Sequence, residues 1–167
     1  MTDIPEEHFR DYCKVCCVEG NIYLVGRYYS DRVTEYNPRT NTWRNMPSLQ
    51  RGRVGPSVCT LDNKIFVLGG NGGRYGDGTI CEMLDLSDDD PHWRYIAQMN
   101  SKHYGGGAVV VERKIYVLGG DTKNVEVYDV DQGRLNRFHK VLALIGQTKQ
   151  QGMCIYYLIM ENLLIYI

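Results

Sequence analysis

The sequence has no long run of charge of one sign and no long apolar run near its start. Its 19 basic and 20 acidic residues leave a net charge of −1, so it lacks the basic patch with which proteins neutralise nucleic-acid phosphates or anionic lipids. The first ten residues are polar, without the apolar segment of a secretory signal, and no Asn-x-Ser/Thr glycosylation sequon occurs. We therefore expect a cytoplasmic chain that binds neither nucleic acid nor a membrane.

Motifs that carry catalysis or bind metals are also scarce. Of the six cysteines, Cys13-x-x-Cys16 has a spacing typical of zinc sites, but no second such pair follows it. The pair falls on a predicted strand, so buried, reduced thiols are the first interpretation and metal or redox use is the alternative. The four histidines are scattered, and the glycine-rich segment 71–76 lacks the Lys-Ser/Thr of a phosphate-binding loop. We predict no cofactor, no metal site and no enzymatic activity.

Glycine and tyrosine are abundant, with 18 and 13 residues, and they recur in a pattern. An apolar run that ends in glycine occurs three times, at Ile22–Gly26, Ile65–Gly70 and Ile115–Gly120. The first glycines of these runs are 43 and 50 residues apart (69 − 26 and 119 − 69). A second segment follows each run, at Val33–Asn37, Cys81–Asp85 and Val125–Asp129. Self-similarity at such a period indicates a repeat architecture.

Each repeat divides into four short apolar segments separated by turn residues such as Asp62-Asn63. Trp43 and Trp93 follow the second segment in the first two repeats, and Gly55 and Gly105 each precede a double glycine by 14 residues. Short segments rich in β-branched and aromatic residues predict strands. Four strands per unit at a period of about 45–50 residues are typical of the blades of a β-propeller.

Together these motifs resemble the kelch repeat, which has a double glycine, then a strand with Tyr and Asp, then a Trp. The sequence is most similar to the kelch-like proteins over residues 12–138. The resemblance implies an all-β fold: a partial kelch β-propeller of four-stranded antiparallel blades, with about three blades and a truncated fourth. Two departures from the pattern are Gly26-Arg27 in place of a double glycine, and the absence of Trp near 135–138. The predicted division is a tail at 1–11 and repeats at 12–50, 51–100, 101–144 (with a degenerate end) and 145–167.

The C-terminal segment fits the start of a fourth repeat, since residues 152–167 align with 55–67 when two residues are inserted. This segment is apolar, but it is too short to cross a bilayer and Glu161-Asn162 interrupts it, so we predict a hairpin. An unclosed propeller leaves strand edges and apolar blade faces uncovered. We therefore expect that the isolated chain is not a stable monomer, and that it self-associates, aggregates or needs the missing blades from a longer chain. Light scattering tests this expectation, which a monodisperse monomer would contradict.

The kelch resemblance implies a protein-binding function without chemistry. In kelch-like proteins the propeller recognises the substrate of a cullin-type E3 ubiquitin ligase, and the cullin is contacted through BTB and BACK domains, which this sequence does not contain. An actin-binding cytoskeletal kelch protein is the alternative within the same class. A kelch-type enzyme such as a copper oxidase, or a truncated product without a stable fold, are alternatives of other classes.

The resemblance also places the residues that contact a partner. Side chains after the double glycine correspond to Tyr28, Asn71 and Asp121, and side chains two places before the upstream glycine correspond to Arg53 and His103. The same loops contain Arg74, Tyr75 and Tyr104, and arginine and tyrosine are frequent anchors of protein interfaces. These eight residues form the predicted partner-binding site. The alternative is that they are ordinary loop residues on a solvated face.

Overall fold

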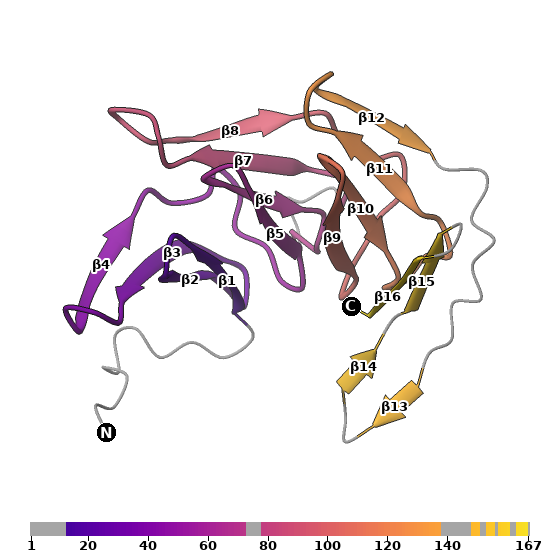
Figure 1. The fold of residues 1–167 in the computed structure, drawn as a ribbon, viewed down its shortest axis with the longest axis horizontal. Coiled ribbons are helices and arrows are strands. Elements are labelled where there is room, and N and C mark those ends of the chain that lie inside the picture. Colours follow the sequence, from indigo (N-terminus) through magenta and orange to yellow (C-terminus); the bar gives the residue numbers. More distant parts are fainter. Residues whose placement is uncertain are drawn as a thin grey trace.

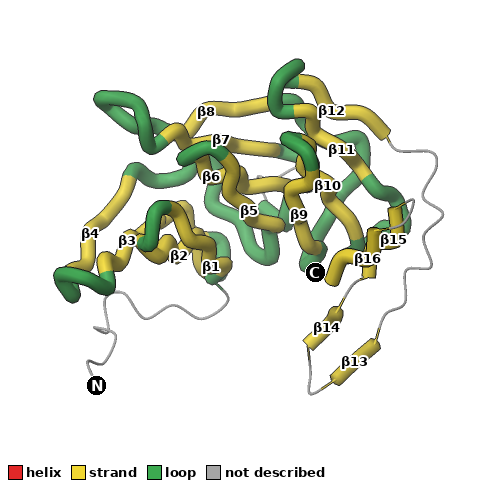
Figure 2. Tube along the Cα trace, viewed as in Figure 1, coloured by secondary structure: helices red, strands yellow, loops and turns green. Residues whose placement is uncertain are grey.

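The protein is built from short antiparallel strands. The computed structural model describes residues 13–72 and 78–137 and four short stretches, at 148–150, 153–155, 157–160 and 163–166. These residues form 16 strands and no helix, and three of the sheets have four antiparallel strands each. The all-β, propeller-type fold predicted from the repeats is confirmed (Figures 1 and 2). The described part of the chain accordingly contains no helix that could cross a membrane.

Each four-stranded sheet is one blade, with its strands in sequence order from the inner to the outer side of the arc in Figure 1. Blade 1 has β1 (Lys14–Val18), β2 (Asn21–Arg27), β3 (Ser30–Asn37) and β4 (Thr42–Met46). Blade 2 has β5 (Ser57–Leu61), β6 (Lys64–Leu68), β7 (Cys81–Asp85) and β8 (Trp93–Ile96). Blade 3 has β9 (Gly107–Val111), β10 (Lys114–Leu118), β11 (Glu126–Asp129) and β12 (Arg134–Arg137).

Two hairpins follow blade 3. They are β13 (Thr148–Gln150) with β14 (Met153–Ile155), and β15 (Tyr157–Met160) with β16 (Leu163–Tyr166). In the second hairpin Met160 pairs with Leu163, as Leu61 pairs with Lys64 between β5 and β6. The hairpin predicted for the C-terminal segment therefore lies at β15–β16, whereas the four strands form two separate sheets and not one blade.

The apolar runs of the sequence become the second strand of each blade, which is buried on both faces. In β6 the side chains of Ile65 and Val67 pack into a core shared with blade 1, whereas Phe66 and Leu68 pack into a core shared with blade 3. All four are at most 1% exposed. Successive side chains of a strand point to opposite faces, so a strand with a neighbouring blade on each side needs a continuous apolar run.

The tryptophan of blade 2 joins it to blade 1. Trp93 is 2% exposed within the core between the two blades, and its Nε1 donates a hydrogen bond of 2.8 Å to the carbonyl oxygen of Pro47. A tryptophan buries a large apolar area and usually finds a partner for its N–H when it is buried. Trp93 therefore has the sealing role that the repeat predicts, whereas Trp43 is half-buried and packs against Tyr36 at 4.6 Å between ring centroids.

The first two strands of each blade are joined by a turn of two residues. Both central residues have positive φ in blade 2, at Asp62 (48°) and Asn63 (59°), and again in blade 3, at Glu112 (46°) and Arg113 (62°). This is the backbone of a type I′ hairpin, which favours Asn, Asp and Gly. Glu112 and Arg113 are unusual there, and the Arg113 side chain forms ion pairs with Asp62 and Asp131.

The antiparallel strand order sorts the loops into two groups, at opposite ends of the blades. We call one the glycine end, because it contains the double glycines and the connections between blades: residues 27–32, 47–56, 69–72, 78–80, 97–106 and 119–125. We call the other the hairpin end: residues 19–20, 37–41, 62–63, 86–92, 112–113 and 130–133. Loops far apart in the sequence are thus brought to one surface.

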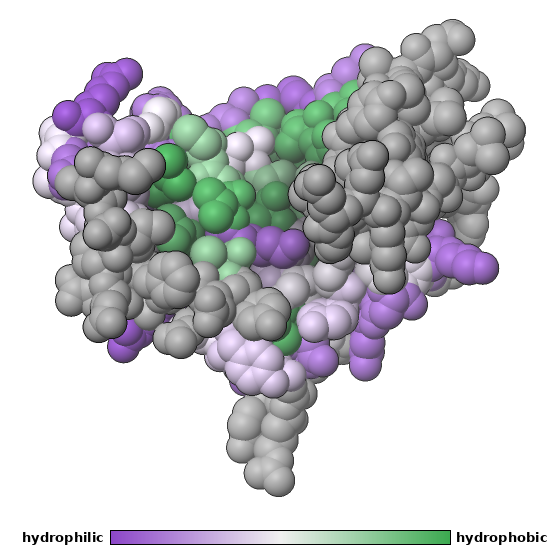
Figure 3. Space-filling view, turned by 90° about the horizontal axis from the view of Figure 1, so that it is seen from below, coloured by the Kyte–Doolittle hydropathy of each residue, from purple (hydrophilic) through white to green (hydrophobic). Residues whose placement is uncertain are grey.

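The inner strands of the three blades lie next to one another, since β5 contacts both β1 and β9. Most residues of these three strands are half-buried rather than fully buried. Figure 3 views the molecule from below Figure 1, the side on which these strands lie, and shows apolar surface in the middle of this view. The outer strands β4 and β8 carry more exposed residues, which places the main cores between blades and not at the rim.

Candidate functional site

Hydrogen bonds join the loops of the glycine end into one scaffold. Val54 and Asn71 exchange two backbone hydrogen bonds, of 2.9 and 2.8 Å. The amide of Gly70 donates to the carbonyl oxygen of His103 at 2.8 Å, so the scaffold extends to the next connection between blades. Gly70 has φ +88°, and a Cβ at this position would lie 2.9 Å from the nitrogen of Pro56. The double glycine therefore allows two loops to approach closely at the backbone.

A buried ion pair anchors the connection between blades 1 and 2. Arg53 and Glu82 have side chains that are 3% and 0% exposed, and the guanidinium donates a short hydrogen bond to the carboxylate. Arg53 also donates to the carbonyl oxygen of Ile80 at 2.6 Å, and Glu82 accepts from the amide of Gln50 at 2.7 Å. Burial raises the pKa of the Glu82 carboxyl and lowers that of Arg53, and the attraction between the two charges opposes both shifts.

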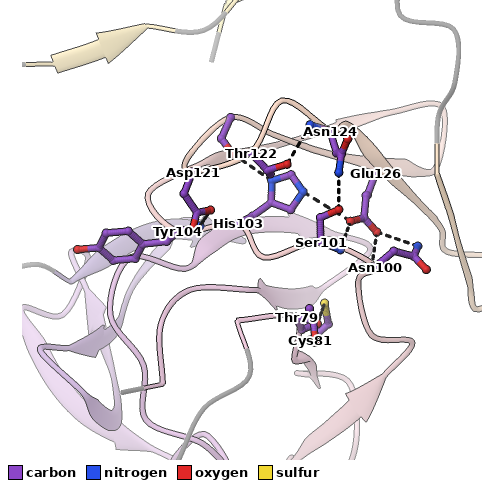
Figure 4. Close-up of polar contacts among 11 residues, drawn as sticks. Thr79, Cys81, Asn100, Ser101, His103, Tyr104, Asp121, Thr122, Asn124 and Glu126 are labelled. Atoms are coloured by element: carbon purple, nitrogen blue, oxygen red, sulfur yellow. Dashed lines mark hydrogen bonds and ion pairs between the residues drawn. The ribbon is translucent and has the colours of Figure 1, made fainter. Parts of the chain in front are cut away.

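Blade 3 repeats this arrangement with histidine in place of arginine (Figure 4). Glu126, which is fully buried, accepts hydrogen bonds of 2.7 and 2.6 Å from the amides of Asn100 and Ser101. The His103 ring is also fully buried, with Nδ1 3.0 Å from the carbonyl oxygen of Gly119 and Nε2 3.7 Å from the Glu126 carboxylate. In blades 2 and 3, then, a buried glutamate holds the loop that leads into its own blade.

These contacts change how two of the predicted site residues are understood. Arg53 and His103 were expected as side chains that contact a partner, and the structure places both in the interior. The burial of Arg53 indicates that its loss would lower the stability of the protein. Whether either residue also contacts a partner stays a prediction. Sequence reasoning missed Glu82 and Glu126, although an acidic residue at the same position of an apolar strand in two repeats was a usable signal.

Four of the predicted site residues are exposed at the glycine end: Tyr28, Asn71, Tyr104 and Asp121. Tyr28 is 66% exposed and Tyr104 46% exposed, and the Asp121 carboxylate accepts a hydrogen bond of 3.2 Å from the amide of Tyr104. In Figure 4 the Tyr104 ring points away from the buried network around His103. The remaining two predicted residues, Arg74 and Tyr75, lie outside the described residues.

Two glycines, Gly52 and Gly55, lie close to the loops that carry the exposed tyrosines. A Cβ on Gly52 would clash with the backbone oxygen of Tyr29, and a Cβ on Gly55 would lie 2.7 Å from the Tyr104 ring. Residues 52–55 therefore lie between the loop of blade 1 and the loop of blade 3. The neighbouring rings of Tyr28 and Tyr29 meet edge to face at 4.7 Å. A rigid, partly aromatic surface is the kind that protein interfaces use.

The cysteines do not gather into a site in the described part of the chain. Burial raises the pKa of Cys16 and of Cys59 to about 12, which keeps both thiols protonated at neutral pH. Cys17, the neighbour of Cys16 on the opposite face of β1, is exposed. Within the described ranges, no group of three or more His, Cys, Asp or Glu side chains could hold a metal ion.

Known proteins resemble this chain in sequence and in fold. A family model described as "Kelch motif" matches residues 9–50. Kelch-like protein 23 of Homo sapiens is 26% identical over 156 residues, which cover 91% of this chain and 27% of the relative. A putative F-box/kelch-repeat protein of Arabidopsis thaliana is 34% identical over 145 residues, covering 80% of this chain and 35% of the relative. The chain thus spans about a quarter to a third of the length of these relatives.

Among solved structures, the structure of YjhT matches with a TM-score of 0.65. The match covers 88% of this chain and 58% of that one at 18% identity. At this level of identity the likeness shows the fold alone.

Proposed function

Since this is a kelch-repeat chain folded as blades of a β-propeller, we propose that it binds a protein partner through the glycine end. The observation that carries the proposal is the row of exposed tyrosines, Tyr28, Tyr29 and Tyr104, on loops that hydrogen bonds hold in place. Tyrosine offers a large contact area with a polar group at its tip, and fixed loops lose little freedom on binding. Both features support recognition of a protein surface or segment.

A finer proposal is that the partner is a substrate of a cullin-type E3 ubiquitin ligase, for which this propeller is the recognition module. Sequence similarity to kelch-like proteins over 91% of the chain supports it. The cullin would then be reached through BTB and BACK domains outside these 167 residues, and recognition would take place in the cytoplasm.

Site-specific photo-crosslinking in cytoplasmic extract tests the binding surface. A benzophenone amino acid at position 104 should form an adduct with a partner, whereas the same amino acid at Tyr95, an equally exposed tyrosine on the outer strand β8, should not. The substitution Tyr104→Ala should abolish capture by a crosslinker at position 28. Equal adduct yields at positions 104 and 95 would contradict the proposed surface.

The adduct also tests the finer proposal, because its partner can be identified by mass spectrometry. In cells that express the full-length product, the identified partner should be ubiquitinated, and Tyr104→Ala should lower its ubiquitination. Capture of actin, or a partner whose ubiquitination does not depend on Tyr104, would refute the adaptor role and leave protein binding intact.

A further inference from the structure

The connections that lead into blades 2 and 3 present equivalent acceptors to one buried side chain. In blade 2 these acceptors are the carbonyl oxygen of Gly69, the first glycine of its pair, and the carboxylate of Glu82. The guanidinium of Arg53 donates to both, and its hydrogen bond to the carbonyl oxygen is 3.3 Å long. Arginine carries five N–H donors and stays charged at physiological pH. Both acceptors therefore keep their donors when the pH changes.

In blade 3 a histidine faces the equivalent pair of acceptors (Figure 4). Nδ1 of His103 lies 3.0 Å from the carbonyl oxygen of Gly119, and Nε2 lies 3.7 Å from the carboxylate of Glu126. A carbonyl oxygen can only accept a hydrogen bond, so the proton of a neutral ring belongs on Nδ1. Nε2 then carries no N–H, and this buried nitrogen forms no hydrogen bond to a described residue. Only the imidazolium has an N–H for each acceptor.

The ring of His103 is the group near this connection that changes charge close to neutral pH. Besides Glu126, the ionisable groups around it are carried by β7, by the two connections and by the loop after β10: Arg53, Cys81, Glu82, Lys102, Tyr104 and Asp121. The thiol of Cys81 is uncharged, because burial and, to a smaller extent, the nearby Glu126 carboxylate raise its pKa to about 11. Among these types of side chain, histidine is the one that ordinarily titrates between about pH 5 and 8.

We propose that His103 makes the connection between blades 2 and 3 a pH-sensitive switch that closes when the ring is protonated. In the imidazolium form Nδ1 donates to Gly119, Nε2 donates to Glu126, and the buried carboxylate gains a counter-charge. Loss of the proton leaves this carboxylate buried without a counter-charge. The stability that protonation contributes is therefore present below the range in which the ring titrates and is lost as the pH rises through it. The amides of Asn100 and Ser101, which donate to Glu126, should open to solvent more often at higher pH.

The switch has a consequence for partner binding, because Tyr104 directly follows His103 in the same loop. Binding that uses Tyr104 should be stronger at about pH 6 than at about pH 8, since an ordered loop loses less freedom when it binds. This consequence rests on the proposed function. The pH response of the loop itself does not, so an experiment on the isolated chain can refute the switch and leave the proposed function intact.

Native-state hydrogen exchange of the full chain, followed by NMR, tests the switch. The amides of Asn100 and Gln50 are a matched pair, because each donates a hydrogen bond of 2.7 Å to the buried glutamate of the following blade. After correction for the intrinsic exchange rate at each pH, the protection of the Asn100 amide should fall by about tenfold between about pH 6 and pH 8. The protection of the Gln50 amide should change by less than about twofold, because its glutamate is paired with an arginine.

Three variants identify the group that responds to pH. His103→Arg supplies the donors of blade 2 and should keep the Asn100 amide protected at both pH values. His103→Gln has no titrating ring, so the protection of Asn100 should be the same at both pH values. His92→Gln replaces an exposed histidine of the hairpin end and should leave the pH response unchanged. In the unaltered chain, the NMR signals of the His103 ring should titrate over the range in which the protection of Asn100 falls.

Each of three results would overturn the switch. The first is an equal loss of protection at Asn100 and Gln50, which would show that the whole chain loses stability as the pH rises. The second is a pH response of Asn100 that persists in His103→Gln, which would assign it to another group. The third is a His103 ring that keeps one protonation state from about pH 5 to pH 8. None of these results would affect the crosslinking test of the binding surface.

Discussion

Breaking the buried pair between Arg53 and Glu82 should destabilise the protein far more than breaking an exposed pair. Both side chains lie almost entirely out of solvent. In Arg53→Met the Glu82 carboxylate stays buried without its counter-charge, and in Glu82→Leu the guanidinium and the amide of Gln50 lose their acceptor. Removal of one partner from a buried pair costs about 3–5 kcal/mol. Since domains are stable by about 5–15 kcal/mol, either variant would lose a large fraction of its free energy of unfolding.

The double variant Arg53→Met, Glu82→Leu distinguishes a true pair from two independent effects. It leaves no buried charge, but the carbonyl oxygen of Ile80 and the amide of Gln50 lose partners, at about 1–3 kcal/mol for each buried group left unsatisfied. The double variant should therefore be less destabilised than the sum of the two single variants, by about 3 kcal/mol in a double-mutant cycle.

Urea unfolding followed by circular dichroism at pH 7 gives the free energies of unfolding. The comparison requires that the dependence of this free energy on urea concentration has the same slope in all variants. Arg94→Met is the matched control, because its pair with Asp88 is largely exposed and should contribute less than about 1 kcal/mol. If Arg53→Met and Arg94→Met shift the midpoint equally, or if the single variants are additive, the reasoning about the buried pair is refuted.

Three further perturbations test other parts of the fold. Trp93→Ala should lower the free energy of unfolding by about 3–5 kcal/mol, because the ring fills the core between blades 1 and 2. A change below about 1 kcal/mol, measured by urea unfolding, would be inconsistent with that packing. Iodoacetamide at pH 8 should modify the exposed Cys17 rapidly and Cys59 slowly, since burial raises the pKa of Cys59 to about 12. Equal rates of modification in the folded protein, measured by mass spectrometry, would contradict the burial of Cys59. Glu112→Asn with Arg113→Gly should raise the melting temperature, because relief of left-handed backbone strain of about 1 kcal/mol or more at each of the two residues exceeds the contribution of the two exposed ion pairs of Arg113. A lower melting temperature would show that the two ion pairs dominate.

Much of the fold is determined by patterns local to the sequence. The run Ile65–Leu68 is apolar at every position, and such a run is stable only as a strand covered on both faces, which the blades on either side provide. Asp62-Asn63 is suited to the two-residue turn that it forms, because both residues tolerate positive φ. The four-strand unit and its repetition followed from such signals, and they were enough to predict the blades.

The burial of Arg53 and His103 was decided by the tertiary structure. Each stands in a polar loop, where a charged or titratable side chain is usually solvated. Each side chain turns inward because a buried glutamate from a later strand lies beside it: Glu82, 29 residues after Arg53, and Glu126 in the case of His103. Likewise, only the antiparallel course of the strands brings Arg51 and Lys102 to one surface and Asp62 and Asp131 to the other. The sequence determines which side chains are present and which of them share one face of a strand. Long-range packing determines which of those side chains are exposed and can reach a partner.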